Sequence, residues 1–367
     1  MQNSSLIKLF AGLTVLIFVA VAILNFWKPA APETAKITPT FTNAQDYSAS
    51  YKPPVPRAVR PKLEPEPETD DTGLLKIPRD KVEAWLAKHN RNASSLLAAF
   101  RAMGDTNYLN EAATNFPNDP RVELTVLARD AFPAERRKWL DLFKASSPSN
   151  SLANYLSAQD LFKNGKTDEA VQELLAASEK SQFQNYSMET QLNGEELYQY
   201  SGKSPMEAVT YALSGMAGDV LPQLATFKGL AQSLGDLMKQ KSDAGDADST
   251  ANLGQIGLAF ADKISSGDSG KLLINQLVGL AVNRIMLSQL NQDTSYDFLN
   301  GATPAQVVQQ LKDEKISMVQ LAKSFSAILP SLTDEESFVF HERVKIYGET
   351  AAMKWVIQQH PPSNPPK

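Results

Sequence analysis

The chain contains 367 residues with a formal net charge of -5, and 43% of its residues are hydrophobic, which is enough for a folded body of several hundred residues. The slightly acidic balance excludes the broad basic surface with which proteins contact nucleic-acid phosphates, so we expect no nucleic acid as a partner. The absence of cysteine excludes disulfides, thiolate nucleophiles and cysteine-ligated metal sites.

Residues 1–27 are predicted to form a short tail and a transmembrane anchor. The run 9–27 is apolar except for Thr14 and Asn25, and at about 1.5 Å per helical residue it spans roughly 28 Å, close to the hydrocarbon thickness of a bilayer. A cleaved signal peptide is the alternative. Its apolar core is usually shorter, and the first pair of small residues after the run, at positions 30–31, is enclosed by prolines, which favours the anchor.

The charges that flank this run leave its orientation open. Lys8 precedes the run whereas Lys28 and Lys36 follow it, which favours a cytoplasmic body by the positive-inside rule. A short N-terminal tail before an apolar run is instead typical of an anchor that exports the chain behind it. We expect a single-pass membrane protein whose body lies on the periplasmic or extracytoplasmic side.

Residues 28–76 are predicted to be a disordered linker, because they contain nine prolines and few large apolar side chains. Proline-rich chain favours extended polyproline II at about 3.1 Å per residue, so this segment can hold a body far from the membrane. We interpret it as a tether. Recognition of its PPVP and PEPE segments by a proline-binding domain is the alternative, but no basic-flanked PxxP pattern favours it.

The chain from residue 77 onward is predicted to be all-α, because helix-start signals recur and strand patterns are nearly absent. Capping-box patterns, in which Ser or Thr precedes Glu or Gln by three positions, occur at residues 204–207, 303–306 and 333–336. Short connections predict antiparallel neighbours. Helices are predicted over residues 81–89, 93–103, 107–116, 121–130, 134–145, 152–164, 167–180, 188–200, 205–216, 222–241, 248–264, 270–290, 304–328 with a possible break near Asp313, and 333–359.

The segment 152–177 resembles a tetratricopeptide repeat. The residues that carry the likeness are Ala158, Leu161, Gly165, Ala170, Leu174 and Ala177. In that pattern small residues let the two helices of a hairpin approach, large apolar residues pack a turn away, and the glycine lies at the turn. Asn154 and Ser157 depart from the family pattern, and no proline closes the unit.

Proline-asparagine punctuation at residues 117–120 and 148–150, about thirty residues apart, extends the resemblance over roughly residues 90–180. Such hairpins are apolar on two faces, so neighbours must stack into a curved solenoid with a groove. The resemblance therefore implies stacked hairpins over residues 77–182. A helical C-terminal domain would follow over residues 183–360, as a bundle or as further repeats, with a disordered tail over 361–367. An unrelated helical bundle is the alternative.

The concave face of such a solenoid would be the binding surface, and its partner would be a protein or peptide. By the family geometry this face would present Arg101, Tyr155, Gln159, Phe162 and Lys163. The alternative packs the rings of Tyr155 and Phe162 between hairpins and leaves only the polar members on the surface.

Two loops approach patterns of known chemistry. Residues 267–270, Gly-Asp-Ser-Gly, resemble the segment around the nucleophile of trypsin-like proteases, but those enzymes are β-barrels in which a His and an Asp converge on the serine. Residues 265–272 also approach a phosphate-binding loop, without its first glycine, its magnesium-binding hydroxyl or a preceding strand. We interpret this loop as a turn that caps the following helix, whose free amides could hold an anion weakly.

Asp243, Asp246 and Asp248 suggest a calcium site, but they lack the glycine and the terminal glutamate of an EF-hand. The three histidines lie far apart, and none occurs in HExxH spacing. We therefore expect no metal, no cofactor and no catalytic residue. Anchor, tether and hairpins together predict a non-enzymatic scaffold that recruits a protein near the membrane. A tethered hydrolase or small-ligand-binding domain within residues 188–359 is the alternative.

Overall fold

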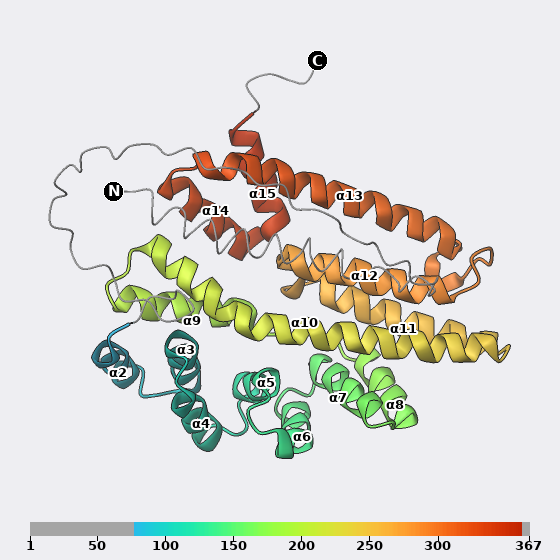
Figure 1. The fold of residues 1–367 in the computed structure, drawn as a ribbon, viewed down its shortest axis with the longest axis horizontal. Helices are drawn as coiled ribbons and strands as arrows, with labels where there is room; N and C mark the ends of the chain where they lie inside the picture. The colour runs from blue at the N-terminus through green and yellow to red at the C-terminus, as the bar shows by residue number, and fades with distance from the viewer. Residues whose placement is uncertain (1–76, 362–367) are drawn as a thin grey trace, which may run out of the picture.

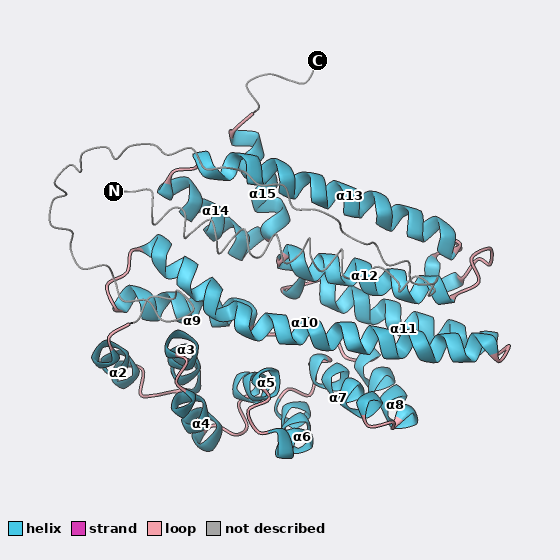
Figure 2. Ribbon diagram, in the orientation of Figure 1, coloured by secondary structure: helices cyan, strands magenta, loops and turns pink. Residues whose placement is uncertain are grey.

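The computed structural model of the chain describes residues 77–361, and within that range it is entirely helical (Figure 2). The predicted anchor and linker lie outside the described residues, as does the tail from residue 362 onward. None of the described helices is both long enough and apolar enough to cross a bilayer.

The helices follow one another with short connections, as the spacing of the caps predicted. Their bounds are α2 (Arg79–Lys88), α3 (Ala93–Met103), α4 (Thr106–Asn115), α5 (Pro120–Arg129), α6 (Arg136–Ser146), α7 (Leu152–Lys163), α8 (Thr167–Ser178), α9 (Ser187–Tyr200), α10 (Pro205–Asp243), α11 (Ala247–Ser265), α12 (Leu273–Gln289), α13 (Pro304–Ile328), α14 (Asp334–Tyr347) and α15 (Glu349–Gln359). Four 3-10 turns join them: η1 (Pro133–Glu135), η2 (Ser269–Lys271), η3 (Asp297–Leu299) and η4 (Leu329–Ser331).

The three predicted capping boxes all form. Ser204, Thr303 and Thr333 are the caps of α10, α13 and α14, and each side chain accepts a hydrogen bond from the backbone N–H three residues later. In each case the Glu or Gln at that position accepts a bond from the cap's own N–H in return. These pairs satisfy helix-start donors that would otherwise lack a partner, which is why the three starts were predictable.

Two helix boundaries differ from the prediction. α10 continues for 39 residues through Pro222, where the sequence predicted two separate helices. A proline inside a helix costs about 3 kcal/mol, but Val220 and Leu224 on either side are buried against other helices, and this packing holds the axis together. Conversely, the predicted helix 333–359 is broken at Gly348, whose φ of +85° is incompatible with a continuing helix. α13 runs without a break.

α10 is the central element of the molecule (Figure 1). The hairpins α3–α4, α5–α6 and α7–α8 lie in a row along one side of it, and the first helix of each hairpin contacts it. α9 folds back on its N-terminal part, α12 packs on the side away from the hairpins, and α11 packs beside the C-terminal part of α10, where it also contacts α8. α13, α14 and α15 form an outer group that contacts the rest mainly through α12, with α14 also touching α10.

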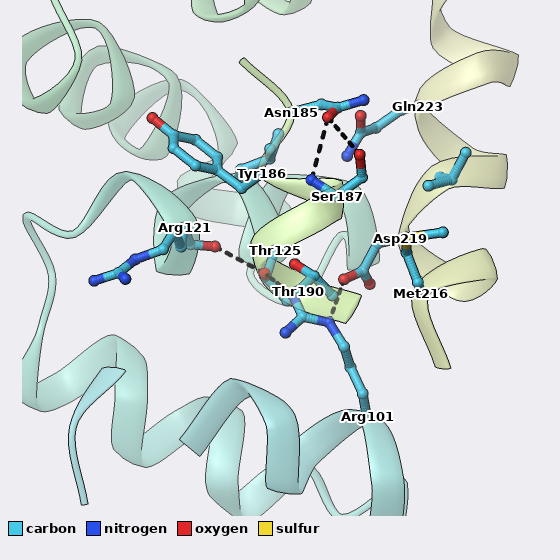
Figure 3. A pocket seen from close by; sticks show the side chains of 12 residues that line it. Arg101, Arg121, Thr125, Asn185, Tyr186, Ser187, Thr190, Met216, Asp219 and Gln223 are labelled. Atoms are coloured by element: carbon cyan, nitrogen blue, oxygen red, sulfur yellow. Dashed lines mark hydrogen bonds and ion pairs between the residues drawn. The ribbon is translucent and has the colours of Figure 1, made fainter. Parts of the chain in front are cut away.

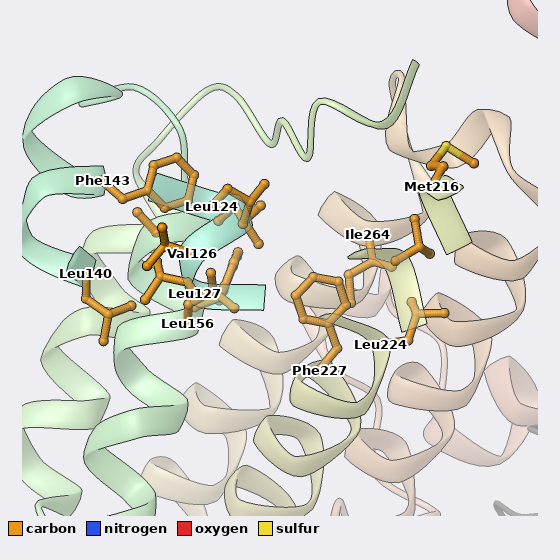
Figure 4. Packing of buried hydrophobic residues seen from close by; sticks show 14 of the residues in the cluster. Leu124, Val126, Leu127, Leu140, Phe143, Leu156, Met216, Leu224, Phe227 and Ile264 are labelled. Atoms are coloured by element: carbon orange, nitrogen blue, oxygen red, sulfur yellow. The ribbon is translucent and has the colours of Figure 1, made fainter. Parts of the chain in front are cut away.

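The apolar core is continuous from the hairpins into α12. One cluster runs from Ile77 to Leu290 and includes side chains of α5, α6, α7, α10 and α11, as Figure 4 shows. It crosses the boundary that the sequence analysis placed at residues 182–183, so the hairpins and the helices after them share one core. A second cluster, from Leu273 to Val356, joins α12 to the outer group α13–α15.

Candidate protein-binding surfaces

The hairpin that resembles a tetratricopeptide unit forms as two helices, α7 and α8. Its turn contains Gly165 at φ +72°, which only glycine adopts without strain. The side chains that carry the resemblance are all buried at the contact between the two helices or beside it: Ala158, Leu161, Ala170, Leu174 and Ala177. The pattern therefore placed this hairpin and its turn correctly.

The inner face of the hairpin row is covered by α10 rather than open to solvent. Arg101 of α3 points at this helix, where its Nε donates to Oδ2 of Asp219 at 2.5 Å (Figure 3). Arg129 of α5 donates to the other carboxylate oxygen of Asp219 at 2.7 Å. Arg101 also donates to Oγ1 of Thr125 at 2.9 Å. One carboxylate of α10 thus holds two arginines from successive hairpins.

Small residues on α10 permit this close approach. A Cβ added at Gly218 would lie 2.5 Å from an Nη atom of Arg129, and one added at Gly229 would lie 2.7 Å from Nε2 of Gln159. The two glycines are eleven residues apart, which brings them to the same side of the helix at 3.6 residues per turn. α10 therefore carries a surface shaped to the side chains of the hairpins.

The five residues predicted for the concave face divide into two groups. Tyr155 and Gln159 are buried beneath the central helices, and the side chain of Arg101 is 9% exposed at its contact with α10. The ring of Tyr155 lies 4.4 Å from that of Phe260 on α11, and burial raises the pKa of its hydroxyl. Tyr155 Oη and Gln159 Oε1 have no hydrogen-bond partner within the described part of the chain.

Phe162 and Lys163 form the second group. Phe162 is half-buried and packs against the main cluster, whereas Lys163 at the end of α7 is exposed. Only one member of the predicted set therefore lies fully on the surface. This cover could not be predicted from the local sequence, because the covering residues lie up to 118 positions further along the chain.

The junction of α3, α5, α9 and α10 encloses a small polar cavity (Figure 3). Its volume is about 20 Å³, which is room for one water molecule and far below the several hundred Å³ of a typical ligand pocket. Arg101, Thr125, Thr190 and Asp219 are among the residues that line it. The cavity belongs to the contact between the hairpins and α10.

A larger concave surface lies at the far end of the hairpin row, between α8 and α11, with the end of α10 at its base. This groove has a volume of about 820 Å³. Its apolar lining consists of Val171, Leu175, Leu237, Leu253, Ile256 and Ala259. Leu175 is 41% exposed, whereas Leu253 and Ile256 are buried in the floor beneath it. The sequence analysis did not identify the groove, since its two walls are some eighty residues apart in the chain.

Polar side chains border the apolar floor of the groove. Gln172, Asn252 and Gln255 contribute amides along the rims, and Asp168 and Lys241 lie at the end where α8 and α11 begin. The nearest partner of Lys241 is Asp246, with Nζ and Oδ2 separated by 3.9 Å. An apolar floor within a polar rim is the usual composition of a protein-binding surface.

The protease-like loop is a structural turn in this fold. Ser269 is 2% exposed, and its hydroxyl accepts a hydrogen bond from Nδ2 of Asn275 at 3.1 Å. His341 is buried in α14, where burial lowers its pKa to about 4, so it is a neutral imidazole at pH 7. Among the described residues no hydrogen bond joins these two side chains, so the geometry of a catalytic pair is not present.

The start of α12 already holds a carboxyl side chain. Leu273 N–H donates to a carboxylate oxygen of Glu349 at 2.8 Å, at the point where the sequence analysis placed a weak anion site. This carboxylate comes from the first residue of α15, and burial raises its pKa. The N–H of Leu273 is thus already bonded, which leaves fewer free backbone donors at this helix start for an external phosphate.

The acidic turn before α11 caps that helix. Asp246 accepts the backbone N–H of Ser249 at 3.1 Å, and Asp243 pairs with Lys239 at 2.7 Å. Within the described range, no three His, Asp or Glu side chains are grouped closely enough to hold a metal ion.

The geometry offers two candidate surfaces: an inner face that the chain covers itself and an open groove beside it. Comparisons with protein families, with curated proteins and with solved structures find no match.

Proposed function

We propose that this chain is a membrane-tethered, non-enzymatic helical scaffold that recruits a protein through the groove between α8 and α11. The apolar run 9–27 and the proline-rich segment 28–76 provide anchor and tether in this proposal. The row of three hairpins along α10, with its resemblance to tetratricopeptide repeats, provides the binding body.

The observation that carries the proposal is the open groove of about 820 Å³, with its apolar floor and amide rim. Leu175 on this floor is 41% exposed, and Val171, Leu237 and Ala259 are only partly buried, so the folded chain leaves apolar surface there for a partner. The hydrolase alternative has less support, because its best candidate nucleophile, Ser269, is buried and bonded to Asn275.

Site-specific photo-crosslinking in native membranes tests the proposal. A photoreactive benzoylphenylalanine is placed at Gln172 in the groove and, as a control, at the exposed Lys312 on α13. We expect a protein adduct from position 172 alone, and we expect Leu175→Glu to remove it. Leu192→Glu, which places the same charge at a 51% exposed leucine of α9, should leave the adduct intact.

An adduct that persists in Leu175→Glu, or the absence of any adduct specific to position 172, contradicts the proposal.

The anchor has a test of its own. A compartment-specific reporter fused after Lys367 should be active on the extracytoplasmic side, and carbonate extraction should leave the protein in the membrane fraction. Release of the protein by carbonate would contradict the predicted membrane anchor.

A further inference from the structure

We propose that the occupant of the groove between α8 and α11 is an amphipathic α-helix of the partner, with a basic residue at the end that meets Asp168 and Asp248. This inference rests on the proposed function and specifies the chemistry of the partner. It follows from the spacing of the apolar side chains, from the packing beside the groove and from the charges at its mouth.

The walls of the groove are two helices that run in the same direction. Their first turns lie at one mouth, and near the other end Nζ of Lys263 on α11 donates to the carbonyl oxygen of Ser181, just after α8, at 3.4 Å. α8 has 12 residues and is therefore roughly 18 Å long, which sets the length of the groove at about three helical turns.

The apolar side chains repeat at helical spacing on both walls. Val171 and Leu175 are four residues apart on α8, and Leu253, Ile256 and Ala259, the first two of them buried in the floor, recur every three residues on α11. Rows at these spacings form the ridges between which the side chains of a third helix pack. An incoming helix with apolar residues at positions i, i+4 and i+7 matches this surface.

An extended peptide fits the groove less well. The backbone groups of α8 and α11 are paired within their own helices, so the walls offer an extended segment no ladder of main-chain donors and acceptors. Rim amides such as Gln172 and Asn252 could satisfy only a few of its groups. A helix satisfies its own backbone and presents mostly side chains, which is what an apolar floor requires.

The chain already packs a helix against the adjoining surface. α10 lies along the inner face of the hairpins, and its end, at Leu237 and Lys241, forms the base of the groove. A helix seated between α8 and α11 would therefore extend an existing layer of helices by one member. The groove is continuous with an interface that this fold has shown to accept a helix.

The mouth of the groove carries unpaired negative charge. Asp168 in the first turn of α8 lines the groove, and Asp248 in the first turn of α11 directly precedes Ser249, which lines it; both acids are exposed, and neither forms an ion pair with another described residue. The other acids nearby have cationic partners, as Asp246 has in Lys241. Each helix start contributes only about half a positive charge, so the two full carboxylates make the net charge at the mouth negative. A lysine or arginine of the partner would be attracted to them.

Fluorescence anisotropy with defined peptides tests this inference on the full chain in detergent micelles. The probe is a labelled 14-residue Leu/Ala peptide with leucines at i, i+4, i+7 and i+11 and lysines at one end. One twin carries a central proline, and a second carries glutamates in place of the lysines. We expect the helical probe to bind at least tenfold more tightly than the proline twin.

Variants of the chain show where the probe binds and which of its ends lies at the acidic mouth of the groove. Leu175→Glu should weaken the helical probe at least tenfold, whereas Leu192→Glu should not change its affinity. The double variant Asp168→Lys, Asp248→Lys should reverse the preference, so that the glutamate twin binds more tightly than the lysine probe. Circular dichroism of each variant checks that the body remains folded.

Equal binding of the probe and its proline twin would overturn the helix inference, and so would unchanged binding in Leu175→Glu. If a groove-specific protein adduct forms in membranes while the proline twin binds as well as the probe, the scaffold proposal stands and this inference fails. Competition by lauric acid that removes probe binding, without any protein adduct in membranes, would assign the groove to an acyl chain and overturn both.

Discussion

Glu123 is a fully buried carboxylic acid on α5, inside the second hairpin. Its Oε2 accepts a hydrogen bond from the hydroxyl of Ser146, while its Oε1 has no partner among the described residues. Burial raises its pKa to about 7, with a smaller contribution from the charge of Asp119 and a partial offset from the Ser146 bond. The folded chain therefore holds this proton to a higher pH than the unfolded chain does.

This pKa predicts that raising the pH destabilises the body. The unfolded chain loses the Glu123 proton near pH 4.5 and the folded chain near pH 7, so the free energy of unfolding falls between these values, by at most about 3 kcal/mol. Glu123→Gln removes this dependence and should be more stable than the parent at pH 8 but not at pH 5. Urea unfolding at the two pH values measures the difference.

Glu111→Gln is the matched control, because Arg91 lowers the pKa of Glu111 and the sign is opposite. That variant should lose stability at pH 8 relative to the parent. If the parent and Glu123→Gln respond identically to pH, the buried acid is not ionising as described.

Asp219 joins two hairpins to α10 through Arg101 and Arg129. Asp219→Asn keeps the shape but leaves two guanidinium groups without their anion, and removing one partner of a buried ion pair typically costs about 3–5 kcal/mol. Because Arg129 is 31% exposed and can turn to water, we expect a loss of about 3 kcal/mol. Chemical denaturation at pH 7 measures it, and Arg129→Gln should cost clearly less. Equal stability of Asp219→Asn and the parent would contradict this role.

The contrast between Lys163 and Arg101 shows what residue patterns can and cannot predict. The resemblance implied that both lie on the concave face of the hairpins, but in the structure Arg101 meets α10 whereas Lys163 is exposed. The partner of Arg101 is Asp219, 118 positions further on, and nothing in either neighbourhood indicates the pairing. The surface implied by the resemblance therefore remains a prediction, and most of the residues named for it lie beneath later helices.

Element boundaries were predictable wherever a local hydrogen bond sets them. The capping boxes at Ser204, Thr303 and Thr333 involve side chains three residues apart, so the sequence contains the whole interaction. The continuation of α10 through Pro222 and the break at Gly348 depend on packing with distant elements. Neither can be derived from the local pattern.

Gly348 separates α14 from α15 with φ +85° and ψ 162°, a combination that side chains other than glycine avoid. A Cβ there would also lie 3.2 Å from the Cα of Lys271. We expect Gly348→Ala to destabilise the outer group α13–α15 by about 2 kcal/mol, measured as faster amide hydrogen exchange in α14 and α15. Exchange in the middle of α10 should not change.

Gly301→Ala separates the two causes, because Gly301 also has a positive φ, of +77°, but no atom within 4 Å of an added Cβ. It should cost less than Gly348→Ala. An equal effect of the two substitutions would show that contact with Lys271 plays no part.

At the scale of the whole molecule, the hairpins depend on the helices that follow them. The main apolar cluster contains residues from both sides of the predicted boundary at 182–183. We therefore expect residues 77–182 alone to melt without a sharp transition, whereas residues 77–361 melt cooperatively. Thermal scanning with circular dichroism compares the two fragments. A cooperative transition of the short fragment near that of the long one would mean that the hairpins form an independent solenoid.

Helical content was predictable at this scale because caps and periodicity recur throughout the chain. The arrangement was not, because a repeat pattern specifies how a hairpin meets its neighbour but not which later helix covers its inner side. The groove between α8 and α11 arises from contact between a hairpin and helices much later in the chain. Its walls become adjacent only after α10 has crossed the molecule.

The position of α10 in the chain also has a consequence for biosynthesis. α8 ends at Ser178 and α10 ends at Asp243, so the ribosome completes the hairpins roughly 65 residues before the helix that covers them. Because synthesis proceeds at about 5–20 residues per second, the inner face of the hairpins stays exposed to solvent for several seconds in every nascent chain. During that interval any other amphipathic helix competes with α10 for the same face. The order of synthesis thus gives each nascent chain a brief interval in which a helix of another protein can bind the inner face of the hairpins before α10 does.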